Sequence, residues 1–344
     1  MTADVSTIAD DRMVEAGFLK KVLTRPEFGS IIGAVAVFAF FSIVTENFFS
    51  VNAISAYLNP AATLGIMSVA VALLMIGGEF DLSAGALIGG LGITMAILTT
   101  SADLPVWLAM LLSLVLAISV GLFNGIMVIK TKLPSFIVTL GTFFILQGAG
   151  LGFVRLITGQ TTIYLSEELA TSNVAKLIFA STPIGGIRIP VVFWIAITAL
   201  ATFLLLRSRY GNWIFSVGGN AASARAVGVP VNRVKIALFI NVSVSAWLVA
   251  MFNTFRFESA QIGTGVGSEF EFIIAAVIGG CLLTGGYGSA IGASIGALIF
   301  EMVRQGLAFA RWEADWFKLF LGVMLLLAAL LNQWVRTRAR RAMS

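Results

Sequence analysis

Apolar runs of about 20 residues recur along the whole chain, separated by short polar or glycine-rich stretches. A helix needs about that length to cross roughly 30 Å of hydrocarbon in a bilayer. Charged residues make up 11% of the sequence, against roughly 25% in a typical soluble domain. The sequence therefore predicts an all-α, polytopic membrane protein.

Two of these runs contain residues that disfavour helices. Pro60 lies inside the second run and removes a backbone donor there. Gly148, Gly150 and Gly152 lie near the end of the fifth run. We expect about ten transmembrane helices, with kinks or interruptions in these two. The expected spans are 29–45, 53–76, 84–100, 105–129, 135–155, 190–206, 236–257, 270–284, 288–308 and 316–335.

The placement of positive charge predicts how these spans are oriented. Cytoplasmic segments of membrane proteins carry an excess of Lys and Arg. With both termini in the cytoplasm, most of the 22 Lys and Arg residues fall on that side. We expect a cytoplasmic segment at 1–28, a membrane domain at 29–335 and a basic cytoplasmic tail at 336–344. Within the membrane domain, residues 156–189 are expected outside and residues 207–235 inside.

Several classes of function are disfavoured by what the sequence lacks. It has no histidine, which excludes histidine-based catalytic triads, HExxH zinc sites and histidine proton relays. Cys281 is alone, so no disulfide framework or cysteine metal cluster is expected. The first 28 residues lack the apolar core of a cleavable signal peptide. Membrane topology explains the net charge of +5 better than a nucleic-acid partner does. We expect no enzyme activity and no cofactor in this chain.

The longest basic, glycine-rich interruption runs from Arg207 to Lys235. Asn220 is a good N-cap residue, because its side chain can accept a backbone N–H at a helix start. A short helix is predicted at 221–227. Gly228 stands where a left-handed C-terminal cap belongs, and Pro230 blocks continuation.

This short helix has a slim profile, with four alanines, one serine and a single charge. One interpretation is a mechanical coupling to a partner protein, because such a helix can enter a cleft. The other is an ordinary solvated loop. The candidate coupling residues are Asn220, Ala221, Ala222, Ser223, Ala224, Arg225, Ala226, Val227 and Gly228.

Polar residues inside or beside the apolar runs are candidates for a translocation path. A carboxylate at mid-bilayer costs about 2.5–3.5 kcal/mol on insertion scales, so it usually has a purpose or an interfacial position. Asp81 or Ser83 can alternatively cap the helix that follows, and uncharged polar residues most often bond neighbouring helices. The candidate path residues are Glu79, Asp81, Ser83, Asn124, Gln147 and Glu271.

A faint internal repeat links MIGGEFDLSAGALIGGLG (75–92) to VIGGCLLTGGYGSAIGASIG (277–296). Both stretches place paired glycines between two spans. Interrupted helices in corresponding positions of two halves are typical of transporter sites. Gly292 and Gly296 form a small-xxx-small face, which predicts a close helix contact.

The sequence resembles the permease subunits of bacterial ABC importers for simple sugars: the ribose, xylose, arabinose, galactose and inositol group. The resemblance covers about residues 50–335. The matching stretches are FDLSAG (80–85), FNGIMVIKTKLPSFIVTLGTFFILQG (123–148), RYGNWIFSVGGN (209–220) with AR (224–225), and IGGCLLTGGYGSAIGASIGALI (278–299).

This resemblance implies a type II importer permease in the bacterial inner membrane, which passes a monosaccharide or polyol inward by alternating access. It implies a second permease copy or a sister subunit, a periplasmic sugar-binding protein, and cytoplasmic ATPase subunits that bind ATP and Mg²⁺. The helix at 221–227 matches the family's coupling segment. Two departures stand out: Glu79 replaces a common glycine, and Ala222, Ser223 and Ala224 replace a common Glu-Ala-Ala.

Two other functions stay open from the sequence. An ion-coupled secondary transporter would need its own coupling site, such as Glu79 with Asp81, or Glu301. A passive facilitator would move a small polar solute with no partner. An intramembrane enzyme is disfavoured, because the sequence shows no catalytic set.

Overall fold

The computed structural model describes residues 26–166, 174–183, 185–313 and 315–341. The expected segment 1–28 lies almost wholly outside this range, as does the end of the expected tail 336–344. The elements are α2 (Pro26–Val44), α3 (Val51–Ile76), α4 (Ala84–Thr100), α5 (Val106–Thr131), α6 (Ser135–Thr158), β1 (Thr162–Tyr164), α8 (Val174–Ala180), α9 (Ile189–Arg207), α10 (Arg209–Gly219), α11 (Ala221–Ala226), α12 (Val231–Phe257), β2 (Ser259–Gln261), α13 (Ser268–Ile278), α14 (Ala290–Phe309) and α15 (Asp315–Arg341).

Seven of these helices are long and apolar enough to cross a membrane: α2, α3, α5, α6, α9, α12 and α14, judged by length and composition over the described residues. The apolar helix α4, at 17 residues, is shorter. The chain is thus a multi-pass helical membrane protein, which confirms the expected fold class. The expected number of about ten spans and the orientation of the termini stay predictions.

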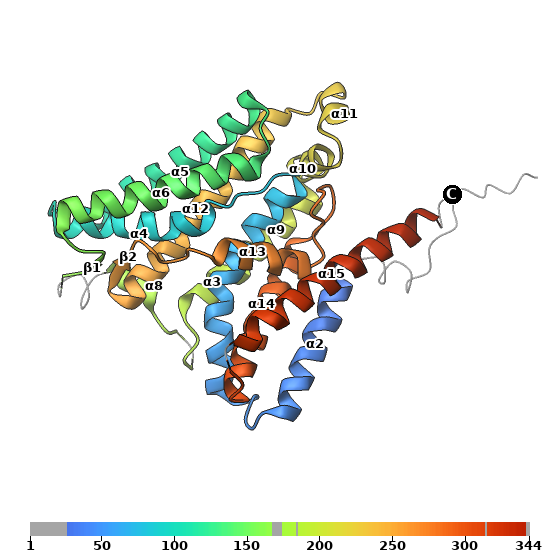
Figure 1. Cartoon of the computed structure of the whole chain (residues 1–344), viewed down its shortest axis with the longest axis horizontal. Coiled ribbons are helices and arrows are strands. Elements are labelled where there is room, and N and C mark those ends of the chain that lie inside the picture. The colour runs from blue at the N-terminus through green and yellow to red at the C-terminus, as the bar shows by residue number, and fades with distance from the viewer. Residues whose placement is uncertain (1–25, 167–173, 184, 314, 342–344) are drawn as a thin grey trace, which may run out of the picture.

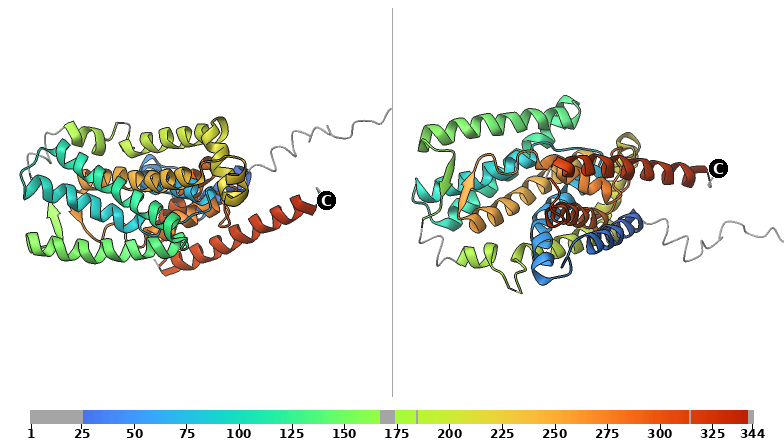
Figure 2. Two further views of the ribbon diagram at one scale, coloured as in Figure 1. Left: turned by 90° about the horizontal axis from the view of Figure 1, so that it is seen from above. Right: turned by 60° about the horizontal axis from the view of Figure 1, so that its bottom comes forward.

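The helices form a bundle with α3 at its centre. Of the apolar window of α3, 83% is buried inside the protein, against 22% for α6. Helix α3 packs against α9, α12, α13 and α14, whereas α6 runs along the outside of the bundle in both views of Figure 2. A helix that is apolar and yet uncovered suits contact with lipid. We infer that α6 lies at the bilayer-facing surface.

The two ends of the bundle differ in what they carry (Figure 1). At one end, β1 pairs with β2 in an antiparallel ladder, with Thr162 opposite Gln261 and Tyr164 opposite Ser259. Helix α8 lies at the same end, and its Phe179 ring stacks on Phe255 at 5.7 Å. Helices α10 and α11 lie at the opposite end. The ladder end and the α11 end are named in this way below.

Breaks at the two expected positions are wrong, because both helices are continuous, whereas the alternative expectation of kinks stays a prediction. Helix α3 continues through Pro60, and the hydroxyl of Thr63 donates to the Pro60 carbonyl at 3.0 Å. Dense packing of the residues that follow holds the helix, since Ala61, Ala62 and Ile66 are fully buried. Helix α6 likewise runs through its three glycines and ends at Gly159, which has a φ of 70°. Neighbouring packing and Ser/Thr side chains are what make such residues tolerable in membrane helices.

The expected eighth span, 270–284, is also wrong as a continuous helix. Helix α13 has 11 residues and ends at Ile278. That is about 16 Å of helix, roughly half of the hydrocarbon thickness. The helix stops because Gly280 adopts a φ of 93°, a conformation that reverses the chain. Residues 279–289 then lead into α14 without helical structure.

The faint sequence repeat is real at the level of the backbone. Helices α3 and α13 both end in a glycine pair with the same dihedral pattern: Gly77 and Gly279 have a φ of −70°, and Gly78 and Gly280 have φ values of 83° and 93°. The same pattern of backbone hydrogen bonds caps the C-terminal end of each helix. For example, the N–H of Glu79 donates to Leu74 at 3.1 Å. Its counterpart is the N–H of Cys281, which donates to Ala276 at 3.0 Å. The two stretches are therefore structurally equivalent helix ends.

The predicted small-residue contact is confirmed between α13 and α14. A Cβ built on Gly296 would lie 2.0 Å from the carbonyl oxygen of Ala275, and one on Gly292 would lie 1.9 Å from that of Gly279. The two backbones therefore touch at a distance that no larger residue permits.

Candidate functional site

Helix α11 matches its prediction closely. The Asn220 side-chain oxygen accepts the backbone N–H groups of Ala222 and Ser223 at 3.0 and 2.9 Å. The helix ends one residue earlier than expected, at Ala226, and Gly228 has a φ of 86°. An Asn cap of this kind is worth about 1 kcal/mol. Both ends of a six-residue helix are therefore fixed by local chemistry.

The surface that α11 presents is small and mostly uncharged. Ala224 is buried against the rest of the protein, whereas Ala222, Ser223 and Ala226 are exposed. Val227 is 80% exposed, an unusual setting for a large apolar side chain. Arg225 is exposed and donates to the Asn232 side-chain oxygen at 3.3 Å. This surface suits insertion into a cleft of a partner.

Helix α10 connects α11 to the bundle, and the sequence did not predict it. Ser208 caps it by accepting the N–H of Gly211 at 3.1 Å, and Ile214 and Val217 face the core. Burial raises the pKa of the Tyr210 phenol above its ordinary value, so the phenol keeps its proton. It donates that proton to the Val234 carbonyl at 3.4 Å.

The end of α10 crosses both glycine-paired loops at one point. A Cβ on Gly218 would lie 1.7 Å from the carbonyl oxygen of Ile76 and 2.7 Å from the nitrogen of Gly286. The same Gly286 N–H donates to the Ile76 carbonyl at 2.8 Å. Three backbones are therefore in direct contact, and α10 cannot move without affecting the ends of α3 and of the 279–289 loop.

Glu79 does not face a free space in this structure. Its carboxylate forms an ion pair with the Lys235 ammonium near the start of α12. The Glu79 side chain is 8% exposed and that of Lys235 is 20% exposed. A buried carboxylate needs such a partner, because desolvation alone is costly.

Asp81, Ser83 and Asn124 are brought together in one buried network. The Ser83 hydroxyl donates to Asp81 Oδ1 at 2.5 Å and accepts from the Asn124 amide at 3.0 Å. The Thr142 hydroxyl donates to the Asn124 carbonyl oxygen at 2.7 Å. The chain of bonds joins the 79–83 loop to α5 and α6. The other oxygen of Asp81 has no hydrogen-bond partner among the described residues.

The expected cap of α4 takes a different form. Asp81 accepts the N–H of Ser83 at 2.8 Å, but the Ser83 side chain makes no bond to the first turn of the helix. Its hydroxyl is already committed to the network. Asp81 therefore fixes the loop that leads into α4 rather than the helix end itself.

The remaining two path candidates lie apart from this network. Glu271 on α13 pairs with Arg304 at 2.5 Å, and Arg304 also pairs with the buried Glu301 at 2.8 Å. Gln147 is half-buried on α6 and makes no side-chain hydrogen bond within the described part of the chain.

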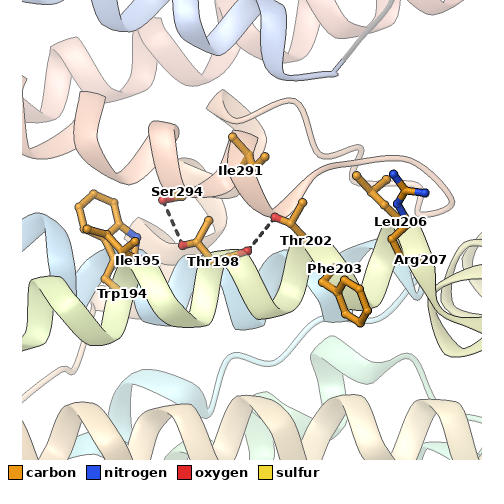
Figure 3. A pocket seen from close by; sticks show the side chains of 10 residues that line it. Trp194, Ile195, Thr198, Thr202, Phe203, Leu206, Arg207, Ile291 and Ser294 are labelled. Atoms are coloured by element: carbon orange, nitrogen blue, oxygen red, sulfur yellow. Dashed lines mark hydrogen bonds between the residues drawn. The ribbon is translucent and has the colours of Figure 1, made fainter.

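Sequence reasoning missed two hollows in the surface. One, of about 580 Å³, lies between α9 and α14 (Figure 3). Its walls are mostly apolar. The polar side chains among them include Thr198, which donates to Ser294 at 3.3 Å, and Thr202, which donates to the Thr198 carbonyl at 2.7 Å. Trp194, Ile195 and Phe203 line it. These walls suit a lipid acyl chain better than a polar solute.

The other hollow, of about 350 Å³, lies at the ladder end between α4, α12 and the turn after β2. Side chains from three separate segments meet there, which no local pattern predicts. Polar side chains are frequent in its lining: Thr162, Asn253, Thr254, Ser259, Gln261 and Thr264.

Comparison with known proteins places the chain in a family. A family model described as branched-chain amino acid transport system / permease component matches residues 53–329. The chain is 29% identical over 326 residues to the probable ABC transporter permease protein YphD of Escherichia coli, covering 94% of this chain and 95% of that protein.

Two further relatives carry more specific names. The chain is 28% identical over 316 residues to the autoinducer 2 import system permease protein LsrD of Klebsiella pneumoniae, covering 90% of this chain and 94% of that protein. It is 29% identical over 314 residues to the ribose import permease protein RbsC of Haemophilus influenzae, again covering 90% and 94%. No solved structure matches the chain. Since the family model extends from α3 into α15, this chain belongs to the family of branched-chain amino acid transport system permease components.

Proposed function

We propose that this chain is the membrane-spanning permease subunit of an ATP-driven ABC importer in a bacterial inner membrane. It passes a monosaccharide or polyol into the cytoplasm by alternating access. Family membership supports the transport role. Relatives named as permeases for ribose, xylose and fructose support this class of solute over an amino acid.

The observation that carries this proposal is the geometry of α11. A short helix with both ends capped stands exposed at one end of the bundle, and its backbone leads directly into the glycine crossing. Such a helix has little core of its own to stabilise it, so a binding role explains its construction. In the proposal it docks into a cytoplasmic ATPase subunit, which binds ATP and Mg²⁺ and hydrolyses the ATP.

The orientation follows from the position of α11. The segment that carries α10 and α11 contains Arg207, Arg209, Arg225, Arg233 and Lys235, and such an excess of basic residues favours the cytoplasmic side. In the proposal both termini lie on that side too. The ladder end then faces the periplasm, where the region 156–189 meets a sugar-binding protein. A second permease copy or a sister subunit completes the translocation path, and lipid covers the outer faces of α6 and α9.

The contacts that α10 makes with α11 and with the end of α3 give a route for the motion. ATP binding closes the two ATPase subunits and moves α11. Helix α10 follows, and Gly218 displaces the end of α3 at Ile76. The ion pair of Lys235 with Glu79 moves α12 together with the same loop. The Asp81 network then transmits the shift to α5 and α6, so that the bundle opens on its other side.

An ion-coupled transporter is the main rival. Ion pairs argue against Glu79 and Glu301 as its coupling site, but not against Asp81, which has no cationic partner among the described residues. Glu79 is paired with Lys235, and Glu271 and Glu301 are paired with Arg304. Carboxylates that are already neutralised are poor binding sites for a driving ion.

Uptake under two kinds of energy depletion separates the candidates. Cells that carry the intact system take up radiolabelled D-ribose, D-xylose or D-fructose, with and without an uncoupler and with and without ATP depletion. The proposal expects uptake that stops when ATP is depleted and continues when the proton gradient collapses. Uptake that stops with the uncoupler and continues after ATP depletion would establish ion coupling. Uptake that continues under both treatments would establish a passive facilitator.

A further inference from the structure

The hollow at the ladder end is built like a binding site for a small uncharged solute. Its volume of about 350 Å³ falls in the range of roughly 300–1,000 Å³ typical of ligand pockets. The walls come from α4, α12, the β1–β2 ladder and the turn that follows β2. All four belong to tightly packed parts of the bundle, so the hollow does not depend on a loose loop.

Two glycines of α4 permit close packing against neighbouring segments, and this packing fixes one wall of the hollow. A Cβ on Gly89 would lie 2.3 Å from the carbonyl oxygen of Ile262, and one on Gly92 would lie 2.8 Å from the Thr254 hydroxyl. The turn after β2 is thereby seated directly on the α4 backbone. The hollow is consequently preformed rather than opened by a ligand.

Four of the polar side chains in this hollow make no hydrogen bond within the described part of the protein, whereas the Ser259 hydroxyl donates to the Phe257 carbonyl at 3.1 Å. These four side chains are those of Asn253, Gln261, Thr162 and Thr264. Two amides and two hydroxyls offer both donors and acceptors. Groups of this kind match the alternating donors and acceptors of a polyhydroxylated solute.

The uncharged lining of the hollow further narrows the class of solute that it can bind. No acidic or basic side chain of the described residues lines it. The nearest charges in sequence are not part of the lining. Glu258 pairs with Lys176 at 2.6 Å, and the Arg256 guanidinium lies 4.7 Å from the centroid of the Phe257 ring, which does line the hollow. A zwitterionic amino acid would leave two charges without partners here, which is costly.

We propose that this hollow binds an uncharged sugar or polyol, with the amides of Asn253 and Gln261 as its main hydrogen-bonding groups and the Phe257 ring at its rim. This inference rests on the proposed function, because that proposal is what places the ladder end on the periplasmic side of the membrane. The site is then an entry station for solute on the outer side of the permease. It also sets the solute class within the chain itself, and not in a separate binding protein alone.

Solute protection of an engineered cysteine tests the site without requiring transport. The single native cysteine, Cys281, is buried and gives little background. The full-length Thr264→Cys variant, which keeps both amides, is labelled with a membrane-impermeant maleimide in washed membranes depleted of ATP. Labelling is measured with D-ribose, D-xylose, D-fructose or myo-inositol present, and with L-leucine or D-glucuronate as charged comparators. Asn52→Cys, an exposed position at the start of α3, is the matched control.

The site predicts that at least one uncharged solute slows labelling at position 264 and leaves labelling at position 52 unchanged. Labelling should slow by a factor of 1 + [L]/Kd, or roughly threefold at twice the Kd. Thr162→Cys, which also keeps both amides, provides a second reporter and must show the same preference if Thr264→Cys does not fold. Protection by none of the four solutes, or equal protection by leucine or glucuronate, would overturn the proposal. Because no ATPase takes part, this result is independent of whether uptake is ATP-driven.

Discussion

The side chains of Lys235 and Glu79, which lie 156 residues apart in the sequence, form an ion pair between α12 and the loop that follows α3. Lys235 is the last residue of the basic segment 207–235, which carries α11, and Glu79 lies two residues before Asp81. The pair therefore joins the proposed lever to the buried network. The pair also gives a structural role to Glu79, which stands where the sugar-importer permeases that this sequence resembles commonly have a glycine.

Breaking this ion pair from its two sides should give unequal effects. Lys235→Met leaves the Glu79 carboxylate, 8% exposed, without a partner. The free energy of unfolding should fall by about 3 kcal/mol, which is at the lower end of the range for breaking a buried ion pair. Glu79→Gln leaves the longer Lys235 side chain, which can reach water, so its loss should be smaller. The Glu79→Gln/Lys235→Met double variant should recover part of the stability. Thermal unfolding of the purified variants in detergent measures the order, and equal losses in the two single variants would contradict it.

Two neighbouring glycines at the end of α10 should respond in opposite ways. Gly218→Ala places a Cβ 1.7 Å from the Ile76 carbonyl oxygen, so the three-backbone crossing must come apart. Gly219→Ala meets nothing within 4 Å and is the matched control. We expect Gly218→Ala to abolish transport or folding and Gly219→Ala to keep both. Expression, gel filtration and sugar uptake are the measurements, and normal uptake by Gly218→Ala would show that the crossing is not needed.

Replacements of Asn124 should be graded by hydrogen bonding rather than by size. Asn124→Ala leaves the hydroxyls of Ser83 and Thr142 with fewer partners, at a cost of about 1–3 kcal/mol for each buried group. Asn124→Asp should be worse, because it sets a second carboxylate beside Ser83, whose proton is committed to Asp81. Asn52→Ala, on the exposed start of α3, is the control. Unfolding temperatures check the order, and the network has no stabilising role if all three variants unfold like wild type.

Arg304 should be more important to stability than either single glutamate that it holds. It pairs with Glu271 at 2.5 Å and with the 1% exposed Glu301 at 2.8 Å. Arg304→Met leaves both carboxylates without this cationic partner and should lower the free energy of unfolding by roughly 3–5 kcal/mol. Glu271→Gln keeps the pair with Glu301 and should cost less. The comparison is again made by unfolding in detergent; a larger loss in Glu271→Gln would contradict this assignment.

Much of this fold could be predicted from the sequence, because the responsible signals are local. Apolar runs of the right length place most of the spanning helices. The caps of α11 could be assigned because Asn220 and Gly228 act on backbone groups within three residues. The repeat could be suspected from its glycine pairs, since the helix ends at Gly77 and Gly279 need that composition.

What the sequence could not supply depends on residues far apart in the chain. The partner of Glu79 is remote, and the hollow at Asn253 is assembled from three segments. Helix α10 was missed because its glycines and polar residues read as a loop, although packing of Ile214 and Val217 stabilises it. The break after Ile278 was missed for the opposite reason: the apolar residues beyond it resemble a span, but Gly280 reverses the chain.

The most direct test of the central claim is whether an ATPase is held by α11. Tagged chain is purified in mild detergent from its native membrane, and the proteins that accompany it are identified by mass spectrometry. Wild type is compared with Arg225→Glu and with Gly228→Pro, which cannot adopt the φ of 86° at that position. Arg155→Glu, an exposed arginine at the far end of α6, is the matched charge reversal.

The account predicts that an ATPase subunit accompanies wild type and Arg155→Glu and is lost from both α11 variants, while all four proteins elute as folded species. Absence of any ATPase from wild type in several detergents would contradict it. Retention of the ATPase by both α11 variants would also contradict it, since the contact would then lie elsewhere.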